Sequence, residues 1–457
     1  MRTRQEANLK KVLGLSDVLG FVFGQIVGAG VLILTGIGIG LTGKGIVVAF
    51  IITGLINCIT VLPMAQLASA IPVTGAGYRY SSMLMGPKWG FLWQIGIIVS
   101  KITIALFALS FAEYLQGLFP AAPIVTTALI MLTFFYVLNL VGIKTAATTQ
   151  KYLVLIKISG LLVFAAWGIS SIDITSFAST EAIMPNGLDG LLQAVGIVAY
   201  ASYGGVMVAE LGGEMKNPSR DIPLGILIGT IGSTLIYALI ALVASGTLPI
   251  AEVANKPLSL VAKSVLPEPA YLYFMIAGAV ISIGTTLNAV FQWVTKGMIV
   301  ACEDGWLPRK LGQVNVKFGT PHYALTFFYI LGVVTILSGI SLGDIARLGF
   351  GFLLIVSIIP VLGCAFLPKK YPEQYAKALF RMKPSILYPC IWLAVVIMIG
   401  QVFYVLKGLP TNLKIAEGII VALSILYVNI AGNYLKKKQS TATELTSVIE
   451  TGIKTPD

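Results

Sequence analysis

Residues 20–40 have the sequence GFVFGQIVGAGVLILTGIGIG. The stretch is apolar and long enough to cross the hydrocarbon core of a bilayer, which takes about 20 residues of helix. At its middle, Gly28-Ala29-Gly30 can leave the helical hydrogen-bond pattern and expose peptide N–H and C=O groups. Such a break is tolerated only beside protein or a water-filled cavity, so the stretch predicts a binding site inside a membrane.

The composition of the whole chain fits an all-α integral membrane protein. Of its 457 residues, 57% are apolar and 11% are charged, and its mean hydropathy is +0.90, whereas a soluble globular protein carries about 25% charged residues. Hydropathy predicts about twelve membrane-spanning helices, near 16–41, 46–70, 88–117, 121–141, 150–171, 190–213, 222–247, 270–300, 322–340, 343–367, 386–406 and 413–435.

The positions of lysine and arginine predict which side of the membrane each loop faces. Cytoplasmic loops keep these residues, whereas short translocated loops rarely carry them. Every second loop between the predicted spans is poor in lysine and arginine, and these loops together contain only Lys44, Lys256, Lys263, Lys407 and Lys414. The other set of loops is rich in them and includes Arg2, Arg4, Lys10, Lys144 and the run at 436–438. We therefore predict a cell-membrane protein with both termini cytoplasmic, whose net charge of +12 reflects this topology and contact with anionic lipid rather than nucleic acid.

Residues that would build an enzyme or a metal site are scarce. Four scattered cysteines have neither the spacing of metal ligands nor that of a disulfide framework, and His322 is the single histidine. The 19 acidic residues lie mostly in loops, whereas a membrane-embedded enzyme would need Asp, Glu, His or Cys clustered in or near the spans. We therefore predict no metal, no cofactor and no enzymatic activity.

A second interrupted helix is predicted in the span at 190–213, whose middle, from Tyr200 to Gly205, has the sequence YASYGG. Interrupted helices at corresponding positions of two halves are typical of inverted-repeat transporters, which bind their substrate near the bilayer midplane. The N-terminus of a half-helix suits a carboxylate, and the carbonyls freed by a break accept hydrogen bonds from an ammonium group. An α-amino acid presents both groups, so amino acid transport is the predicted function.

Lys157 is the most informative single residue outside these two breaks. It lies inside the span at 150–171, about 9 Å beyond Lys151 at the helical rise of 1.5 Å per residue. A lysine at the bilayer centre costs about 2.5–3.5 kcal/mol or more, which makes it a functional candidate. The alternative is a side chain that extends back to the cytoplasmic interface.

Four motifs follow one another along the chain. They are Gly28-Ala29-Gly30, Ile71-Pro72-Val73-Thr74-Gly75-Ala76-Gly77-Tyr78, Lys216-Asn217-Pro218 with Asp221-Ile222-Pro223, and Glu303-Asp304-Gly305-Trp306-Leu307-Pro308. In this order and at these spacings they resemble the amino acid, polyamine and organocation superfamily, and the resemblance covers nearly the whole chain. It implies a LeuT-type fold of five-plus-five inverted repeats with discontinuous first and sixth helices.

With that fold, the chain is expected to divide into five parts. They are a cytoplasmic N-terminal segment (1–15), a first inverted repeat (16–171), a second inverted repeat (190–367), two further helices (386–435) and a disordered cytoplasmic tail (436–457).

The resemblance also implies roles for residues at the two breaks. Those at the first break would contact the substrate carboxylate, and those at the second its amino group. Tyr200 falls where relatives keep an aromatic gate over the substrate, although ordinary packing is the alternative. The expected substrate-binding residues are Ile26, Gly28, Ala29, Gly30, Lys101, Tyr200, Ser202, Tyr203, Gly204 and Gly205.

A coupling role for Lys157 follows from the same resemblance. In proton-coupled members that look similar, a lysine at this place occupies the position of the sodium ion of sodium-driven relatives. It would release and take up a proton during the cycle, or remain a fixed charge in a sodium-independent exchanger. Ser282 and Thr285 would supply hydroxyls to its ammonium group, although small residues also serve helix packing.

Lys101 lies deep in the span at 88–117, and some amino acid exchangers look similar around it, with a residue there that can face the substrate. A cationic wall disfavours cationic substrates and favours an anionic side chain, as in glutamate. The alternative is a structural lysine bonded to carbonyls or a neighbouring helix. Glu210, near the end of the sixth span, is a candidate for a second protonatable group.

We therefore expect a sodium-independent secondary transporter of amino acids, foremost neutral ones, that works by alternating access with proton coupling or amino acid exchange. A transporter of anionic amino acids is the first alternative, and a nutrient sensor or assembly subunit is the alternative class. The expected partners are the amino acid, membrane lipid and, in a symporter, protons; no accessory subunit is indicated.

Overall fold

The computed structural model describes residues 11, 13–141 and 146–452, and every regular element within them is a helix. Ten helical stretches are long and apolar enough to cross a membrane, and α16 (His322–Leu337) is a shorter apolar helix. One of the ten, Leu15–Ala70, contains two successive spans. The prediction of an all-α integral membrane protein is thus confirmed.

The long helices follow the predicted spans. Their bounds are α1 (Leu15–Ile26) with α2 (Ala29–Thr42), α3 (Ile46–Ala70), α5 (Pro87–Ser100) with α6 (Thr103–Leu118), α7 (Ile124–Val141), α8 (Ala146–Gly168), α10 (Gly187–Tyr203), α11 (Pro218–Gly246), α15 (Ser282–Glu303), α17 (Leu342–Gly363), α20 (Pro384–Lys407) and α21 (Thr411–Gly452). Shorter helices between them are α4 (Ala76–Met85), α9 (Thr180–Ile183), α12 (Ile250–Val253), α13 (Leu258–Val265), α14 (Glu268–Tyr273), α18 (Leu367–Lys370) and α19 (Pro372–Lys377).

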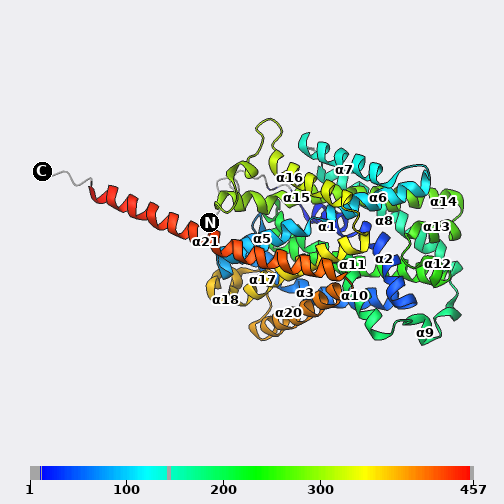
Figure 1. The fold of residues 1–457 in the computed structure, drawn as a ribbon. Coiled ribbons are helices and arrows are strands. Elements are labelled where there is room, and N and C mark those ends of the chain that lie inside the picture. The colour runs from blue at the N-terminus through cyan, green and yellow to red at the C-terminus, as the bar shows by residue number, and fades with distance from the viewer. Residues whose placement is uncertain (1–10, 12, 142–145, 453–457) are drawn as a thin grey trace.

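The long helices lie side by side, with α9, α12, α13 and α14 gathered at one end of the bundle and α18 at the other (Figure 1). We refer to these ends as the predicted outer side and the predicted cytoplasmic side. Helix α21 leaves the body at the predicted cytoplasmic side and continues to Gly452, over most of the stretch predicted to be disordered. Arg2, Arg4, Lys10 and Lys144, which contribute to the predicted charge asymmetry, lie outside the described residues, and the division into five parts stays a prediction.

The surface of the bundle is apolar, as contact with lipid requires. Large hydrophobic side chains are exposed on helices at its periphery, among them Ile130 and Phe134 of α7, Leu235 of α11 and Trp392 of α20. A soluble monomer rarely exposes so many apolar side chains. The body of the protein is therefore built to be surrounded by a bilayer.

Both predicted helix interruptions are present. Helix α1 ends at Ile26 and α2 begins at Ala29, with Val27 extended between them. Helix α10 ends at Tyr203 and continues directly as the 3-10 helix η5 (Gly204–Glu210), whose i to i+3 hydrogen bonds are a common sign of a functional hinge. A third interruption, which was not predicted, separates α5 from α6 at Lys101.

Helix α8 packs backbone to backbone against the π-helix η7 (Phe274–Ile281), which leads into α15. A side chain at Gly160 would begin 2.4 Å from the backbone nitrogen of Gly278. Only glycine permits this approach. Because Lys157 lies one helical turn before Gly160, the contact brings its side chain next to the start of α15.

We expect Gly160→Ala to lower the free energy of unfolding by about 1–3 kcal/mol, because overpacking forces the two backbones apart. The measurement is the midpoint of thermal unfolding in detergent, which should fall. Gly400→Ala is the matched control, since nothing lies within 4 Å of a methyl group built there. Equal midpoints for the two variants would contradict the close approach of α8 and η7.

Candidate functional site

A small cavity of about 30 Å³ lies where the interrupted helices meet. It has room for about one or two water molecules, so a larger ligand needs the helices to move apart. Its lining residues are Gln25, Ile26, Gly30, Lys101, Phe107, Tyr200, Ala201, Gly204, Met207, Thr286, Val290, Trp293 and Leu353. Five of them, Ile26, Gly30, Lys101, Tyr200 and Gly204, belong to the predicted substrate-binding set.

The other predicted substrate-binding residues lie beside the cavity or face away from it. Gly28 lies in the break between α1 and α2, Ala29 is the first residue of α2, and Gly205 packs against Ile26. Tyr203 is buried, with its ring 5.8 Å from that of Phe350.

Ser202 faces away because it lies on the side of α10 that packs against α3. The amide of Asn57 donates hydrogen bonds to its hydroxyl at 2.9 Å and to the carbonyl of Ala199 at 3.2 Å. Asn57 thus joins α3 to the last turn of α10. The structure places Ser202 in helix packing rather than in the cavity wall.

Several lining residues were not predicted. Phe107, Met207, Val290 and Leu353 are ordinary apolar residues in apolar helices, so the sequence carries no signal for them. Gln25 and Trp293 do carry a signal, because each brings a polar group into the middle of a span. The indole N–H of Trp293 donates a hydrogen bond of 3.1 Å to the side-chain oxygen of Gln25, which joins α15 to α1.

Two glycines allow the break in α1–α2 to contact its neighbours closely. A side chain at Gly28 would begin 2.2 Å from the hydroxyl of Thr286, and one at Gly30 would begin 2.8 Å from the Cα atom of Ala201. The break is therefore held between α15 on one side and the last turn of α10 on the other. The two interrupted helices therefore meet at the break, and their place at the bilayer midplane stays a prediction.

The ammonium group of Lys157 fills the break. The side chain is fully buried and donates hydrogen bonds to the carbonyls of Gly24, at 2.9 Å, and Val27, and to the hydroxyl of Thr285 at 3.3 Å. Lys157 therefore points into the protein and does not extend back to the cytoplasmic interface.

Hydroxyl groups from neighbouring helices complete this arrangement. Ser282 donates to the carbonyl of Val27 at 3.3 Å, and Thr286 donates to that of Gly24 at 3.1 Å. Tyr237 of α11 donates to the carbonyl of Ile26 at 2.9 Å. The carbonyls of Gly24, Ile26 and Val27, which lie at the break, thus have donors, as a protein interior in a membrane requires.

The N-terminus of α2 gives the break a second chemical property. The backbone N–H groups of the first turn, which begins at Ala29, have no partner within a helix, and they carry the positive end of the helix dipole. Gly30, in that turn, lines the cavity. An anionic group of a ligand can therefore bind here through backbone N–H groups.

Lys101 places a cation in the cavity wall. It is 4% exposed, and its ammonium nitrogen lies 4.4 Å from the centre of the Trp293 ring, a cation–π contact. It makes no hydrogen bond or ion pair with any residue that the structure describes, and the cavity lining contains no acidic side chain. Glu210 interacts with it electrostatically from outside the lining. Lys101 is thus free to bind an anionic or polar group of a ligand.

Aromatic side chains close the cavity toward the predicted outer side. Tyr200, in the last turn of α10, lies with its ring 5.4 Å from that of Phe350 on α17. Phe107 and Leu353 also line the cavity. Tyr200 therefore joins the cavity wall to α17, and its role as an aromatic gate stays a prediction.

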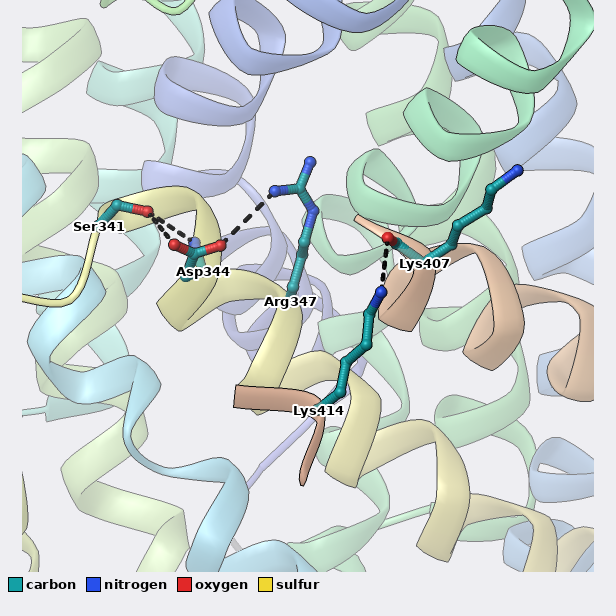
Figure 2. Close-up of polar contacts among 5 residues, drawn as sticks. All are labelled: Ser341, Asp344, Arg347, Lys407 and Lys414. Carbon is teal, nitrogen blue, oxygen red and sulfur yellow. Dashed lines mark hydrogen bonds and ion pairs between the residues drawn. The ribbon is translucent and has the colours of Figure 1, made fainter. Parts of the chain in front are cut away.

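Figure 2 shows polar contacts at the N-terminus of α17 and between α20 and α21. The Ser341 hydroxyl caps α17 by accepting a hydrogen bond of 3.1 Å from the Asp344 N–H, and the Asp344 carboxylate lies 3.8 Å from the guanidinium of Arg347. Lys414, at the start of α21, donates to the carbonyl of Lys407 at 3.1 Å. The Lys407 ammonium also pairs with Asp189 of α10. These contacts hold α10, α20 and α21 together at the predicted outer side.

Comparison with known proteins adds independent information. Residues 13–430 match the model of a family described as amino acid permease. The branched-chain amino acid permease BcaP of Bacillus subtilis (strain 168) is 28% identical over 401 residues, or 81% of this chain and 84% of BcaP. From the same organism, the methylthioribose transporter is 27% identical over 400 residues, 82% of this chain and 84% of its own. The serine/threonine exchanger SteT is 28% identical over 350 residues, 73% of this chain and 78% of its own.

The shared carbonyl of Gly24 generates a test of the site geometry. Lys157→Met and Thr286→Val each leave this carbonyl one donor, but the double variant leaves it none. We expect the double variant to lose about 1–3 kcal/mol beyond the sum of the single effects, the cost of an unsatisfied buried group. Thermal unfolding of all four proteins measures this coupling.

The matched control combines Lys157→Met with Thr35→Val, because the Thr35 hydroxyl bonds to Val31 of its own helix, away from Lys157. Those two effects should add. An additive result for the Thr286 pair would show that Lys157 and Thr286 do not share the carbonyl.

Proposed function

The chain belongs to the amino acid permease family, and from that premise we propose that it moves neutral amino acids across the cell membrane by alternating access, without sodium. Membership makes the protein a multi-pass membrane transporter of amino acids and not an enzyme. The named substrates of its relatives differ from one another, so the substrate class and the coupling must be argued from the residues of this chain.

The single observation that carries the proposal is the position of the Lys157 ammonium group. Any metal cation in the α1–α2 break would use the same oxygen atoms, the carbonyls of Gly24 and Val27 and the hydroxyl of Thr285. A fixed positive charge among these oxygens repels a second cation. Transport is therefore sodium-independent, and Lys157 either carries the coupled proton or stays charged in an exchanger.

The chemistry of the cavity favours an amino acid with a neutral side chain. The substrate carboxylate would lie at the N-terminus of α2 and its amino group near the last turn of α10, where backbone carbonyls can accept hydrogen bonds. The side chain would then face Phe107, Met207, Val290 and Leu353, which are apolar. A cationic side chain would find no acidic partner in this wall.

Alternating access requires that each side of the cavity opens in turn. Tyr200 and Phe350 separate it from the predicted outer side, and η5 with the start of α4 lies on the predicted cytoplasmic side, where we place both termini. A cavity of about 30 Å³ is too small for an amino acid. Substrate entry therefore needs the pair α1–α2 and α10–η5 to move relative to the surrounding helices.

Transport of anionic amino acids is a second candidate function, favoured by Lys101. Its ammonium group lies in the cavity wall beside Trp293 and has no ion-pair partner among the described residues. The carboxylate of a glutamate-like side chain would supply that partner. Cationic amino acids are disfavoured for the same reason, because like charges brought together cost several kcal/mol.

The coupling is tested by uptake of a panel of radiolabelled amino acids into proteoliposomes, with an inward proton gradient and, separately, with preloaded amino acid. We expect uptake to be the same when sodium is replaced by choline. We further expect Lys157→Met to lower gradient-driven accumulation at least about tenfold, because a typical coupling free energy corresponds to a factor of about this size. Lys151→Met is the matched control, since this half-buried lysine of α8 bonds to Ser16 and not to the break.

Accumulation driven by the gradient alone would establish a proton symporter. Uptake only into preloaded vesicles would establish an exchanger and make Lys157 a fixed charge. A requirement for sodium would contradict the proposal, and full gradient-driven accumulation by Lys157→Met would remove the coupling role of this lysine.

Selectivity is tested by competition for uptake with neutral, anionic and cationic amino acids. We expect Lys101→Gln to improve competition by cationic relative to anionic amino acids by about tenfold or more, because the repulsive charge in the wall is gone. Lys151→Gln should leave the order of competitors unchanged. An unchanged order in Lys101→Gln would show that Lys101 has no part in selectivity.

A further inference from the structure

Below the cavity, on its predicted cytoplasmic side, η5 ends at a buried carboxylate. Glu210 is 3% exposed and does not line the cavity. Its side chain accepts a hydrogen bond of 3.1 Å from the N–H of Gly77, in the first turn of α4, and the N–H of Ala76 also bonds to it. An anionic group at a helix N-terminus is favourable, so the ionised carboxylate stabilises the contact between η5 and α4.

The start of α4 is fixed to η5 at this point. Gly75, which precedes α4, has a φ of 71°, a left-handed conformation that favours glycine, and its N–H bonds to the carbonyl of Glu210 at 3.4 Å. Thr74 pairs with Leu211 in an isolated β-bridge. At its other face, α4 is attached to the end of α15 by the hydrogen bond of 2.6 Å from Tyr78 to Asp304. Helix α4 therefore connects the 3-10 helix η5 to the end of helix α15.

Two ionisable groups act on Glu210: the ammonium group of Lys101 and the hydroxyl of Tyr80 on α4. The charged residues of the other helices packed against η5 are engaged elsewhere. Lys296 of α15 pairs with Glu214 at 3.2 Å, and Asp221 of α11 pairs with Arg220 at 3.0 Å. In α1, Asp17 accepts a hydrogen bond from Gly14, and α3 contains no charged residue.

Polar side chains without a protein partner accompany Glu210. The Tyr80 hydroxyl and both polar atoms of the Gln94 amide are buried and make no hydrogen bond within the described part of the chain. Gln94 packs against Gly297, which lies beside the turn at Gly75. Buried groups of this kind are normally satisfied by internal water. Water molecules bonded to Tyr80 of α4 and Gln94 of α5 would give a proton a polar route toward Glu210.

We propose that Glu210 is a second proton-binding site of this transporter, whose ionised carboxylate keeps α4 attached to η5 and whose protonation releases it. The proposal rests on the alternating access proposed above. If η5 left α4 while the carboxylate was ionised, a buried charge would lose its N–H donors, which is strongly unfavourable. A bound proton removes that charge and weakens the same hydrogen bonds. Opening of the predicted cytoplasmic side is then linked to proton uptake at Glu210.

The proposal predicts how strongly the amides of α4 are protected from hydrogen exchange. Hydrogen–deuterium exchange of the full-length protein in lipid nanodiscs is followed by mass spectrometry across a pH series. The exchange rates are corrected for the intrinsic pH dependence of amide exchange. We expect protection of peptides covering Ala76–Met85 to decrease as the pH falls. In Glu210→Gln, which cannot ionise, these peptides should exchange about tenfold faster than in the wild type at high pH, and their protection should not depend on pH.

Glu214→Gln is the matched control, because Glu214 lies four residues further on and pairs with Lys296, with both side chains partly buried. It should keep the wild-type pH dependence. Glu210→Asp, which retains a carboxylate, should also keep a pH dependence, and it replaces Glu210→Gln if that variant does not fold. Protection of α4 that is independent of pH in the wild type, or identical in Glu210→Gln and the wild type, would overturn the proposal.

This experiment is separate from the test of the coupling at Lys157. Hydrogen exchange of α4 does not require that a proton gradient drives uptake. If the protein is an exchanger and the protection of α4 depends on pH, Glu210 keeps its proposed role and Lys157 becomes a fixed charge. If it is a proton symporter and the protection of α4 does not depend on pH, Lys157 keeps its proposed role and Glu210 loses it.

Discussion

The structure depends on how the carbonyl groups freed by the break between α1 and α2 are satisfied inside an apolar protein. Each unsatisfied carbonyl in a membrane interior costs several kcal/mol, and here the donors come from three other helices. Lys157 of α8, Thr286 of α15 and Tyr237 of α11 each donate to a carbonyl in the stretch that ends α1. The break is thus a defined polar centre, and the positions of the surrounding helices follow from the reach of these side chains.

Close packing follows from the same constraint. Lys157 can reach the break only because α8 lies against η7 with glycine on both sides of the contact, at positions 160 and 278. Thr286 can donate only because Gly28 has no side chain in its way. The glycines near the centre therefore have different uses. Some permit a change of backbone direction, and others permit a lysine or threonine from another helix to approach the carbonyls.

The sequence predicted the polar centre better than it predicted the cavity wall. A lysine in the middle of a span is rare in an apolar helix, so Lys157 could be named in advance, and Thr285 with it as a hydroxyl expected to face its ammonium group. The structure brings the two side chains together. Phe107 and Met207 could not be named in advance, because nothing distinguishes a lining apolar residue from one that faces lipid. Ser202 shows the remaining difficulty, since the motif places it in the right turn of α10 but the packing of Asn57 decides which way it faces. The interruption at Lys101 was missed for a related reason, because no glycine or proline marks it.

The buried charges around the cavity are unequal in number, and this imbalance bears on mechanism. Lys157 and Lys101 together carry two positive charges when ionised, and Glu210 carries one negative charge. A zwitterionic amino acid adds no net charge, so the excess of one positive charge remains when a neutral substrate binds. The excess disappears if Lys157 releases its proton or if the substrate brings an anionic side chain. Burial of net charge is costly, so the charges of this chain favour two alternatives, proton release with a neutral substrate or retention of the proton with an anionic one. In both alternatives, the cavity closes around a site whose charges balance. Because Glu210 contributes the negative charge, its protonation would change this balance and, as proposed, release α4 at the predicted cytoplasmic side.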